Sequence, residues 1–427
     1  MKQESVADNT RPVPSPAAVT PLPSTRPTGL RESLSVLGNF DFRLLLLSNI
    51  AMFSGYQIRT MAQAWVVLDL TDSSLKAGIV NAMPGTAIFF LSLFAGAIAD
   101  RSERWWILVW TRAVIAAAGF FTAFLITTGV LEWWHLIPIG LLAGSMFAFH
   151  NPASQAYAMD VVGRERLLSA ASLNTTFSNV ATVGGPALGG YLLAVGADAA
   201  FYLLGAIYGV AFLSTFPMRS RSGRKQVTRN VRSEMADGIR YAWGVPTIRW
   251  LLILALAGVF SGVFQAMMPV FARDVLDVGE LGYGTILAAQ GLGSLTASFS
   301  LVLLGNVRWK GPLVFFNSLL LSGSMVLLAV SDSFGLAIFS SYLFGVSMGV
   351  WFITIPTVLQ MNTSNEMRGR VMGLFFMVAL LFQQGWIIGG VLETSLGPRP
   401  AALIAAAGSA AVTLLAFGAS SSLRKLR

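Results

Sequence analysis

Two polar clusters interrupt a chain that is otherwise strongly apolar. Tyr56, Arg59 and Gln63 follow one another at i, i+3 and i+7, which places them on one face of a helix. The second cluster is the pair His150 and Asn151. A guanidinium can bind an anion, amides and a phenol can hydrogen-bond a polar ligand, and a histidine can take up a proton near neutral pH. These residue types predict recognition of a small molecule.

Groups that make or break bonds are scarce in the sequence. It holds no cysteine and only two histidines, His135 and His150, which excludes thiol catalysis and Cys-ligated metals and disfavours a histidine-rich metal site. Nucleophile–base motifs and the Gly-x-x-x-x-Gly-Lys-Ser/Thr phosphate loop are also missing. We therefore predict no enzymatic activity, no metal and no cofactor, and we exclude ATP-driven pumping by this chain alone.

The elements that must position the polar clusters are membrane-spanning helices. Of 427 residues, 55% are hydrophobic and 11% are charged, whereas a soluble domain carries about 25% charged residues. Runs of about 20 mostly apolar residues can cross a bilayer as helices. Twelve such runs occur, at approximately 43–70, 77–97, 105–128, 134–156, 168–194, 199–218, 249–272, 282–305, 312–331, 334–358, 369–393 and 400–420. The predicted fold class is an all-α membrane protein.

The positive charges predict how the spans are oriented. Nearly all Lys and Arg residues fall in the two tails or in the loops on the same side as the tails. Only Lys76, Arg273 and Arg399 fall in loops on the other side, and Arg59 and Arg112 lie within spans. Because cytoplasmic loops attract basic residues, both termini are predicted to be cytoplasmic. The formal net charge of +9 is then a consequence of topology and does not indicate a nucleic-acid partner.

The chain also repeats itself at an offset of about half the twelve-span region. Pro152, Arg164, Arg166 and Trp105 recur at one constant offset as Pro356, Arg368, Arg370 and Trp309, and Phe53-Ser54-Gly55 recurs as Phe260-Ser261-Gly262. We therefore predict a disordered cytoplasmic tail over 1–38, an N-terminal six-helix half over 39–218, a basic cytoplasmic linker over 219–247, a C-terminal six-helix half over 248–420 and a cytoplasmic tail over 421–427. Duplicated halves predict a substrate site between them, near the bilayer midplane.

The loop between the second and third spans carries a family resemblance. It reads Gly96-Ala97-Ile98-Ala99-Asp100-Arg101-Ser102-Glu103-Arg104 and resembles the signature loop of the major facilitator superfamily, from which it departs at Glu103 and Trp105. The resemblance implies twelve helices in two pseudo-symmetric halves and a conformational latch on the inner side. Its expected members are Gly96, Asp100, Arg101, Arg104, Asp160, Arg368 and Arg370, with Asp100 facing the start of the eleventh span and Asp160 pairing with Arg101 or Arg104.

A second motif lies in the fifth span. Gly185, Pro186, Gly189 and Gly190 resemble the Gly-Pro-x-x-Gly motif of superfamily exporters that work by antiport, although close helix packing alone also explains it. Together with Asn151-Pro152-Ala153, Asn174 and Glu366-x-Arg368-Gly369-Arg370-Val371-Met372, it is similar to the subgroup that contains the enterobactin exporter and the macrolide efflux proteins.

The resemblance implies that the first, fourth, seventh and tenth spans line a central cavity. The candidate substrate-binding residues on these spans are Tyr56, Arg59, Gln63, His150, Asn151, Gln265 and Gln360. Arg59 is the leading candidate for contact with an anionic substrate, because an intramembrane charge usually faces a cavity; it could instead reach the outer interface or pair with a carboxylate. For His150 and the glutamines, the alternative is hydrogen bonding between helices.

The predicted function is secondary active export of a small amphipathic compound, a siderophore or a macrolide-like drug, by alternating access. Proton antiport is implied by the resemblance, yet no carboxylate falls well inside a span, so the carrier would be Asp69, Asp160, Glu393 or His150. A lysophospholipid flippase, an uptake permease and, in another class, a non-transporting membrane sensor or scaffold remain alternatives. The expected setting is a monomer in the lipid bilayer of the bacterial cytoplasmic (inner) membrane, with a small-molecule substrate and the proton as partners.

Overall fold

The chain is mostly helical in the part that the computed structural model describes, which is residues 35–219, 231–305 and 309–424. No strand occurs in these ranges. The apolar composition explains why the chain forms helices, because a backbone surrounded by lipid must satisfy its hydrogen bonds within the same segment. The predicted all-α class is confirmed.

The N-terminal half contains five long helices that provide six spans. They are α2 (Phe40–Thr71), α3 (Ser74–Arg101), α4 (Arg104–Thr127), α5 (Leu136–Val195) and α6 (Ala197–Leu213), with the short helices η1 (Val36–Gly38) and η2 (Trp133–His135) at their starts. Helix α5 holds two spans, because its helical geometry is interrupted at Gly163, where φ is 76° and ψ is 169°.

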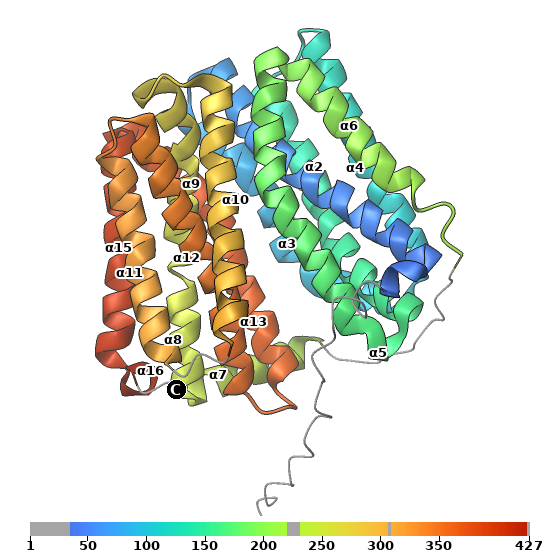
Figure 1. Cartoon of the computed structure of the whole chain (residues 1–427), viewed down its shortest axis with the longest axis vertical. Coiled ribbons are helices and arrows are strands. Elements are labelled where there is room, and N and C mark those ends of the chain that lie inside the picture. Colours follow the sequence, from blue (N-terminus) through green and yellow to red (C-terminus); the bar gives the residue numbers. More distant parts are fainter. Residues whose placement is uncertain (1–34, 220–230, 306–308, 425–427) are drawn as a thin grey trace, which may run out of the picture.

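In the C-terminal half, two of the six spans are assembled from shorter pieces. One consists of α8 (Pro246–Ala255), α9 (Gly258–Val270) and η3 (Phe271–Val275), and another of α13 (Arg368–Leu380), η4 (Leu381–Gln384) and α14 (Gly385–Leu396). The other four are α10 (Gly279–Leu304), α11 (Lys310–Ala329), α12 (Phe334–Met361) and α15 (Pro398–Ala419). The two halves form two bundles that meet at one end and diverge toward the other (Figure 1).

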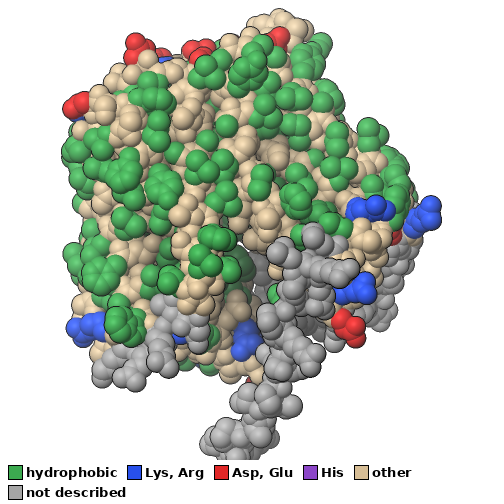
Figure 2. Space-filling model, viewed as in Figure 1, with side chains coloured by type: hydrophobic (Ala, Val, Ile, Leu, Met, Phe, Trp, Pro, Cys, Tyr) green, Lys and Arg blue, Asp and Glu red, His purple; other side chains and the backbone are tan. Residues whose placement is uncertain are grey.

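Among the described residues, nine helical segments are long and apolar enough to cross a membrane by length and composition alone. The first span, α2, is outside this set although it has 32 residues, and it contains the buried polar side chains of Arg59 and Gln63. In Figure 2, the charged side chains gather toward the two ends of the molecule and leave a broad apolar band between them. This distribution matches a bilayer around the middle of the helices.

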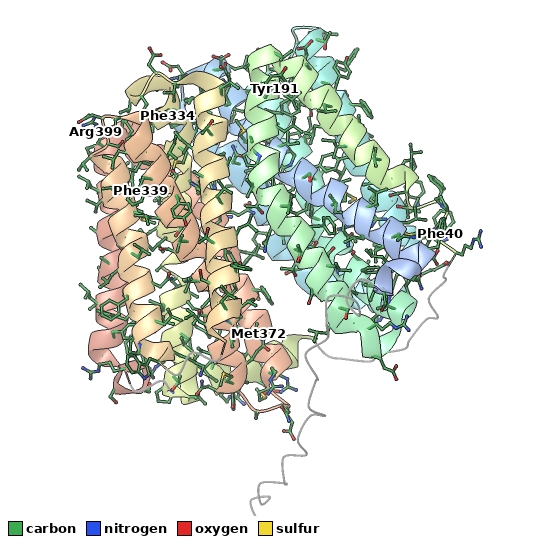
Figure 3. All side chains as sticks on the ribbon, in the orientation of Figure 1. Phe40, Tyr191, Phe334, Phe339, Met372 and Arg399 are labelled. Atoms are coloured by element: carbon green, nitrogen blue, oxygen red, sulfur yellow. The ribbon has the colours of Figure 1, made fainter. Side chains whose placement is uncertain are left out.

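The molecule has two polar ends. The end that carries α7 (Val231–Gly244) and α16 (Ser421–Arg424) is called the linker face. The other end, where turns connect α2 to α3 and α11 to α12, is called the opposite face. Figure 3 marks Arg399 and Phe334 at the opposite face and Met372 toward the linker face.

The predicted tails and linker lie partly outside the described ranges. Residues 1–34, 220–230 and 425–427 are not described, whereas Val36 at the end of the predicted first tail is buried against Phe42 and Leu46. The linker predicted over 219–247 contains the helix α7, which packs on α13 and α8 of the C-terminal half. Exposed apolar side chains on α7, Ile239 and Trp243, follow the pattern of a helix lying at a membrane surface.

Candidate functional site

A cavity of about 480 Å³ lies between the two halves. Both halves supply its walls, which is what the internal repeat predicts for a substrate site. From the N-terminal half the lining comes from α2, α3 and the second span of α5, and from the C-terminal half from α9, α10, α12, η4 and α14. The lining residues are Phe53, Tyr56, Gln57, Arg59, Thr60, Met61, Asn81, Asn179, Thr182, Pro186, Gln265, Tyr283, Leu287, Gln290, Ser294, Phe344, Gly345, Met348, Phe352, Phe382, Gln383 and Trp386.

On the N-terminal wall, Arg59 is held by its own helix. Its Nη1 donates a hydrogen bond of 2.8 Å to Oε1 of Gln63, one turn further along α2. Its guanidinium carbon lies 5.4 Å from the centre of the Tyr56 ring, within the range of a cation–π contact. The hydroxyl of Tyr56 in turn accepts a hydrogen bond of 3.2 Å from Nε2 of Gln383 in the other half. The wall therefore combines a positive charge, an aromatic face and an amide that bridges the halves.

On the C-terminal wall, two amides bind each other. Nε2 of Gln265 on α9 donates to Oε1 of Gln290 on α10 over 3.0 Å, and the reciprocal contact measures 3.4 Å. The surrounding surface is aromatic and thioether-rich, with Phe344, Phe352 and Met348 among its members. Such a wall can pack against an apolar ligand while the amide pair offers hydrogen bonds to its polar groups.

The charge of the cavity comes from a single side chain. Among the described residues that line it, Arg59 is the one Lys, Arg, Asp or Glu, and the lining includes no histidine. Arg59 forms no ion pair with any residue that the structure describes, and its side chain is 6% exposed. A buried cation without a carboxylate produces a positive potential, which favours anionic or neutral ligands over cations.

The structure places three of the predicted substrate-binding residues in the cavity wall, namely Tyr56, Arg59 and Gln265, and Pro186 of the fifth-span motif also lines it. Gln63 and His150 are buried outside that wall, at 2% and 4% exposure. Asn151 and Gln360 are exposed and also lie outside it. That any of these residues binds substrate stays a prediction.

Near His150, a buried polar network joins the helices of the N-terminal half. The fully buried Arg112 donates from Nη1 to the hydroxyl of Thr215 over 2.6 Å. Its Nη2 reaches Oδ1 of Asn49 at 3.5 Å, and the same oxygen accepts a bond of 3.0 Å from Ser154. This network links α2, α4 and α5 with the residues that follow α6, which is a structural role for Arg112.

The predicted latch residues divide into separate pairs. Arg104 forms an ion pair with Asp160, which was expected to pair with Arg101 or Arg104. Arg370 lies 3.4 Å from the carboxylate of Asp237 on α7, a partner that the sequence did not suggest. The side chain of Asp100 lies outside what the structure describes, while Gly96 is helical and both Arg101 and Arg368 are exposed. The latch as a whole stays a prediction.

The fifth-span motif lies in the contact between the halves. A Cβ added at Gly190 would come within 2.7 Å of the Glu280 carbonyl oxygen and 2.9 Å of the Cα of Gly284 on α10. Gly185 and Gly189 approach α2 instead, whereas Gly184 has nothing within 4 Å of an added Cβ. Helices α5 and α10 thus meet backbone to backbone, which only residues without side chains permit.

An arginine joins the halves at the opposite face. Nη1 of Arg273 in η3 donates a bond of 3.0 Å to the carbonyl oxygen of Leu68 in α2, and Nη2 forms an ion pair with Asp72. The adjacent Asp274 holds the guanidinium from its own half, with Nε at 2.6 Å from its carboxylate. Helices α3 and α14 also pack there. The halves are therefore closed at the opposite face, while Figure 2 shows a hollow between them at the linker face.

Sequence reasoning missed several of these residues. Gln290 and Thr182 line the cavity from the eighth and fifth spans, which were not expected to contribute. An amide inside an apolar run was the available signal for Gln290. For Arg273, the signal was a basic residue on the side of the membrane where such residues are rare.

Comparisons with known proteins agree with this architecture. The family model of the transmembrane secretion effectors matches residues 32–427. The multidrug efflux pump Tap of Mycolicibacterium fortuitum is 23% identical over 369 residues, which cover 83% of this chain and 89% of the pump. The enterobactin exporter EntS of Shigella dysenteriae serotype 1 is 24% identical over 340 residues, covering 78% of this chain and 80% of the exporter.

Solved structures share the fold at low sequence identity. An inward-facing, occupied structure of a bacterial homologue of the human lysosomal transporter Spinster superposes with a TM-score of 0.72 at 14% identity and covers 90% of this chain and 97% of its own. The nucleoside transporter NupG superposes with a TM-score of 0.69 at 14% identity, over 91% of this chain and 100% of its own. The predicted twelve-helix fold is confirmed by these neighbours.

Proposed function

Because this chain belongs to the transmembrane secretion effectors of the major facilitator superfamily, and so is a membrane transporter, we propose that it exports a small amphipathic compound by alternating access. The observation that carries the proposal is the cavity between the halves, with Arg59 and Tyr56 on one wall and the Gln265–Gln290 pair on the other. Relatives that share the family include a multidrug efflux pump and an enterobactin exporter.

The direction of transport in this proposal rests on charge. The positive-inside bias of the sequence makes the linker face cytoplasmic. The cavity would then be open to the cytoplasm and closed to the outside by Arg273 and by the packing of α5 on α10. This is the conformation in which an exporter accepts its cargo.

The cargo class follows from the lining of the cavity. A single uncompensated cation in a mostly apolar, aromatic wall suits a neutral or anionic compound with an apolar body. A siderophore and a macrolide-like drug are the proposed cargo types. A lipophilic cation fits less well, since no carboxylate of the described lining would offset its charge.

Proton antiport is the proposed energy source, on the resemblance of the Gly185–Gly190 motif to that of antiporters. Because the described cavity lining has no carboxylate and no histidine, the proton would be carried elsewhere in the protein. The proposed carrier is one of four groups outside that lining, Asp69, Asp160, Glu393 or His150. Each is replaced in turn by Asn or Gln, and the variant that lacks the carrier should keep cargo binding and lose the response of transport to a pH gradient.

The test is transport by the purified protein in proteoliposomes with an imposed pH gradient. The panel holds a catecholate siderophore, a macrolide, ethidium and a lysophospholipid, and each is assayed with the wild type, Arg59→Gln and the cavity-distant control Arg399→Gln. Gradient-dependent movement of the siderophore or macrolide, reduced at least tenfold in Arg59→Gln only, is the expected result. Movement of ethidium that survives Arg59→Gln, or movement of the lysophospholipid alone, would contradict the proposed cargo.

A further inference from the structure

The short helix η4 bonds to the N-terminal half through two consecutive glutamines. Nε2 of Gln383 donates a hydrogen bond of 3.2 Å to the hydroxyl of Tyr56 on α2, and Nε2 of Gln384 donates one of 2.9 Å to the hydroxyl of Thr86 on α3. The helix η4 joins the two longer pieces of the eleventh span, α13 and α14, and it also packs on α9 within its own half. Both hydrogen bonds therefore connect a joint of the C-terminal half to the N-terminal half.

The two hydrogen bonds differ in their access to the cavity. Tyr56 and Gln383 both line the cavity, whereas Thr86 and Gln384 lie outside its lining. The hydroxyl of Thr86 already donates its proton to the carbonyl oxygen of Ala82, over 3.0 Å. In the part of the chain that the structure describes, the hydroxyl of Tyr56 donates to no acceptor. A cargo molecule in the cavity can therefore reach the Tyr56–Gln383 bond, and the Tyr56 proton is available to it.

Packing holds Gln383 in position as well as its hydrogen bond. Its side chain fills the space beside Gly85 on α3, where an added Cβ would lie 2.5 Å from the side chain. The carbonyl oxygen of the preceding Phe382 fills the space beside Gly262 on α9 in the same way. The backbones of both halves thus fix the amide that donates to Tyr56, and separation of the halves at this point must break the bond.

A ligand changes the balance between two conformations only if it binds one of them more tightly. While the halves are joined, a cargo oxygen that accepts the Gln383 amide proton must displace the hydroxyl of Tyr56. Once the halves have separated at the opposite face, both groups face the cavity alone, and the cargo binds them without displacing anything. The difference is worth one hydrogen bond between neutral groups, which corresponds to about a two- to tenfold preference of the cargo for the separated state.

We propose that cargo opens the opposite face by displacing the Tyr56–Gln383 hydrogen bond, with Gln383 as the residue that connects the cavity to the eleventh span. The inference rests on the proposed function, because it requires a cargo in this cavity. It adds that the cargo must present a hydrogen-bond acceptor to Gln383, such as a carbonyl, carboxylate or phenolate oxygen. The Gln384–Thr86 bond lies outside the cavity wall and holds the halves together whether or not cargo is bound.

The test measures the ratio of open to closed opposite faces, from the distance between spin labels on Val195→Cys and Leu281→Cys in proteoliposomes. These exposed positions lie at the ends of α5 and α10. The ratio is determined with and without a catecholate siderophore or a macrolide, at a concentration that saturates each variant. In the otherwise wild-type protein, the bound compound should raise the ratio about two- to tenfold.

Two neighbouring variants separate coupling from closure. Gln383→Leu should raise the ratio to a similar extent without any compound, and the compound should then change it no further. Gln384→Leu is the matched control, because it removes the other hydrogen bond between the halves. It should also raise the ratio without compound but should keep the full response to the compound.

Tyr56→Phe provides an independent test if Gln383→Leu does not fold. It removes the acceptor of the Gln383 bond and keeps the ring that lies against Arg59, so it should behave like Gln383→Leu, and the double variant should show no further change. An equal response to the compound in Gln383→Leu and Gln384→Leu would overturn the inference. Binding is measured separately by titration calorimetry. Binding that leaves the wild-type ratio unchanged contradicts this inference alone, whereas failure of both compounds to bind contradicts the proposed function and, with it, this inference.

Discussion

Replacing Arg273 with Gln should open the face at which the two halves are now joined. The side chain makes two contacts across the halves, to the Leu68 carbonyl and to the Asp72 carboxylate. Asp72 is 85% exposed, so the ion pair contributes only about 0–1 kcal/mol. The hydrogen bond from a charged donor to the Leu68 carbonyl is worth about 1.5–3 kcal/mol.

The expected change in the conformational equilibrium follows from these two terms. Arg273→Gln should destabilise closure at the opposite face by about 2 kcal/mol, or roughly 30-fold in the ratio of the two states. Asp72→Asn removes the exposed ion pair alone and should change that ratio less than about fivefold. The contacts of Arg273 with Asp274 lie within one half and do not cross between the halves.

The assay is double electron–electron resonance, which the chain suits because it has no cysteine of its own. One spin-label pair, Val195→Cys with Leu281→Cys, reports on the opposite-face ends of α5 and α10. A second pair, Leu168→Cys with Leu303→Cys, reports on the linker-face ends of the second span of α5 and of α10. All four side chains are exposed.

In the wild type, the Val195–Leu281 pair should give the shorter distance and the Leu168–Leu303 pair the longer one. Arg273→Gln should populate the reverse arrangement in both pairs. Unchanged distance distributions would refute the assignment of Arg273 as a closing contact. If Asp72→Asn had as large an effect as Arg273→Gln, the inference that the Leu68 carbonyl contributes more to closure than the Asp72 carboxylate would be refuted.

Three other predictions concern stability and closure. Gly190→Leu forces a side chain into the α5–α10 contact, at a typical cost of about 1–3 kcal/mol in stability, and should lower the transport rate at least tenfold. Gly184 has open space around it, so the control variant Gly184→Leu should transport like the wild type. Gln265→Leu and Gln290→Leu should each lower the stability by about 1 kcal/mol by stranding the other amide, and the double variant should be closer to the wild type in Tm than the sum predicts. Thr215→Val should lower Tm by several degrees because the fully buried guanidinium that it binds loses an acceptor worth about 1–3 kcal/mol, whereas Thr215→Ser should not.

The spans were predictable because residues of a membrane-spanning helix that contact lipid must be apolar. A run of apolar residues in the sequence therefore indicates a span directly. The helix α7 was not expected, because it lies in a charged stretch and its apolar residues are on one face only. The interruptions that divide the seventh span into α8, α9 and η3 were also not evident, since hydropathy carries no information about local helix geometry. The break at Gly163 is of the same kind.

For the site, the sequence indicated which residues are chemically unusual but not which way they face. Arg59 and Gln265 were found because polar groups are rare in apolar runs, and both line the cavity. Gln63 shares a helix face with Tyr56, yet it is buried outside the cavity wall. A rotation of a few tens of degrees about the helix axis decides between the two places, and packing against neighbouring helices sets that rotation. The partner of Arg370, on α7, depends on tertiary structure in the same way.

The backbone contact between α5 and α10 has a consequence for how this transporter can change under selection. At Gly190, Gly284 and Gly291 an added Cβ would come within 3 Å of the facing backbone, so these positions admit almost no heritable variation. Side chains such as Gln57 and Met348 line the cavity and lie outside that backbone contact, so they can be exchanged with less disturbance to it. Cells challenged with a toxic compound that the protein does not yet expel should therefore acquire resistance through the cavity wall and not through the glycines. The range of transported compounds can then change while the contact between the two halves is retained.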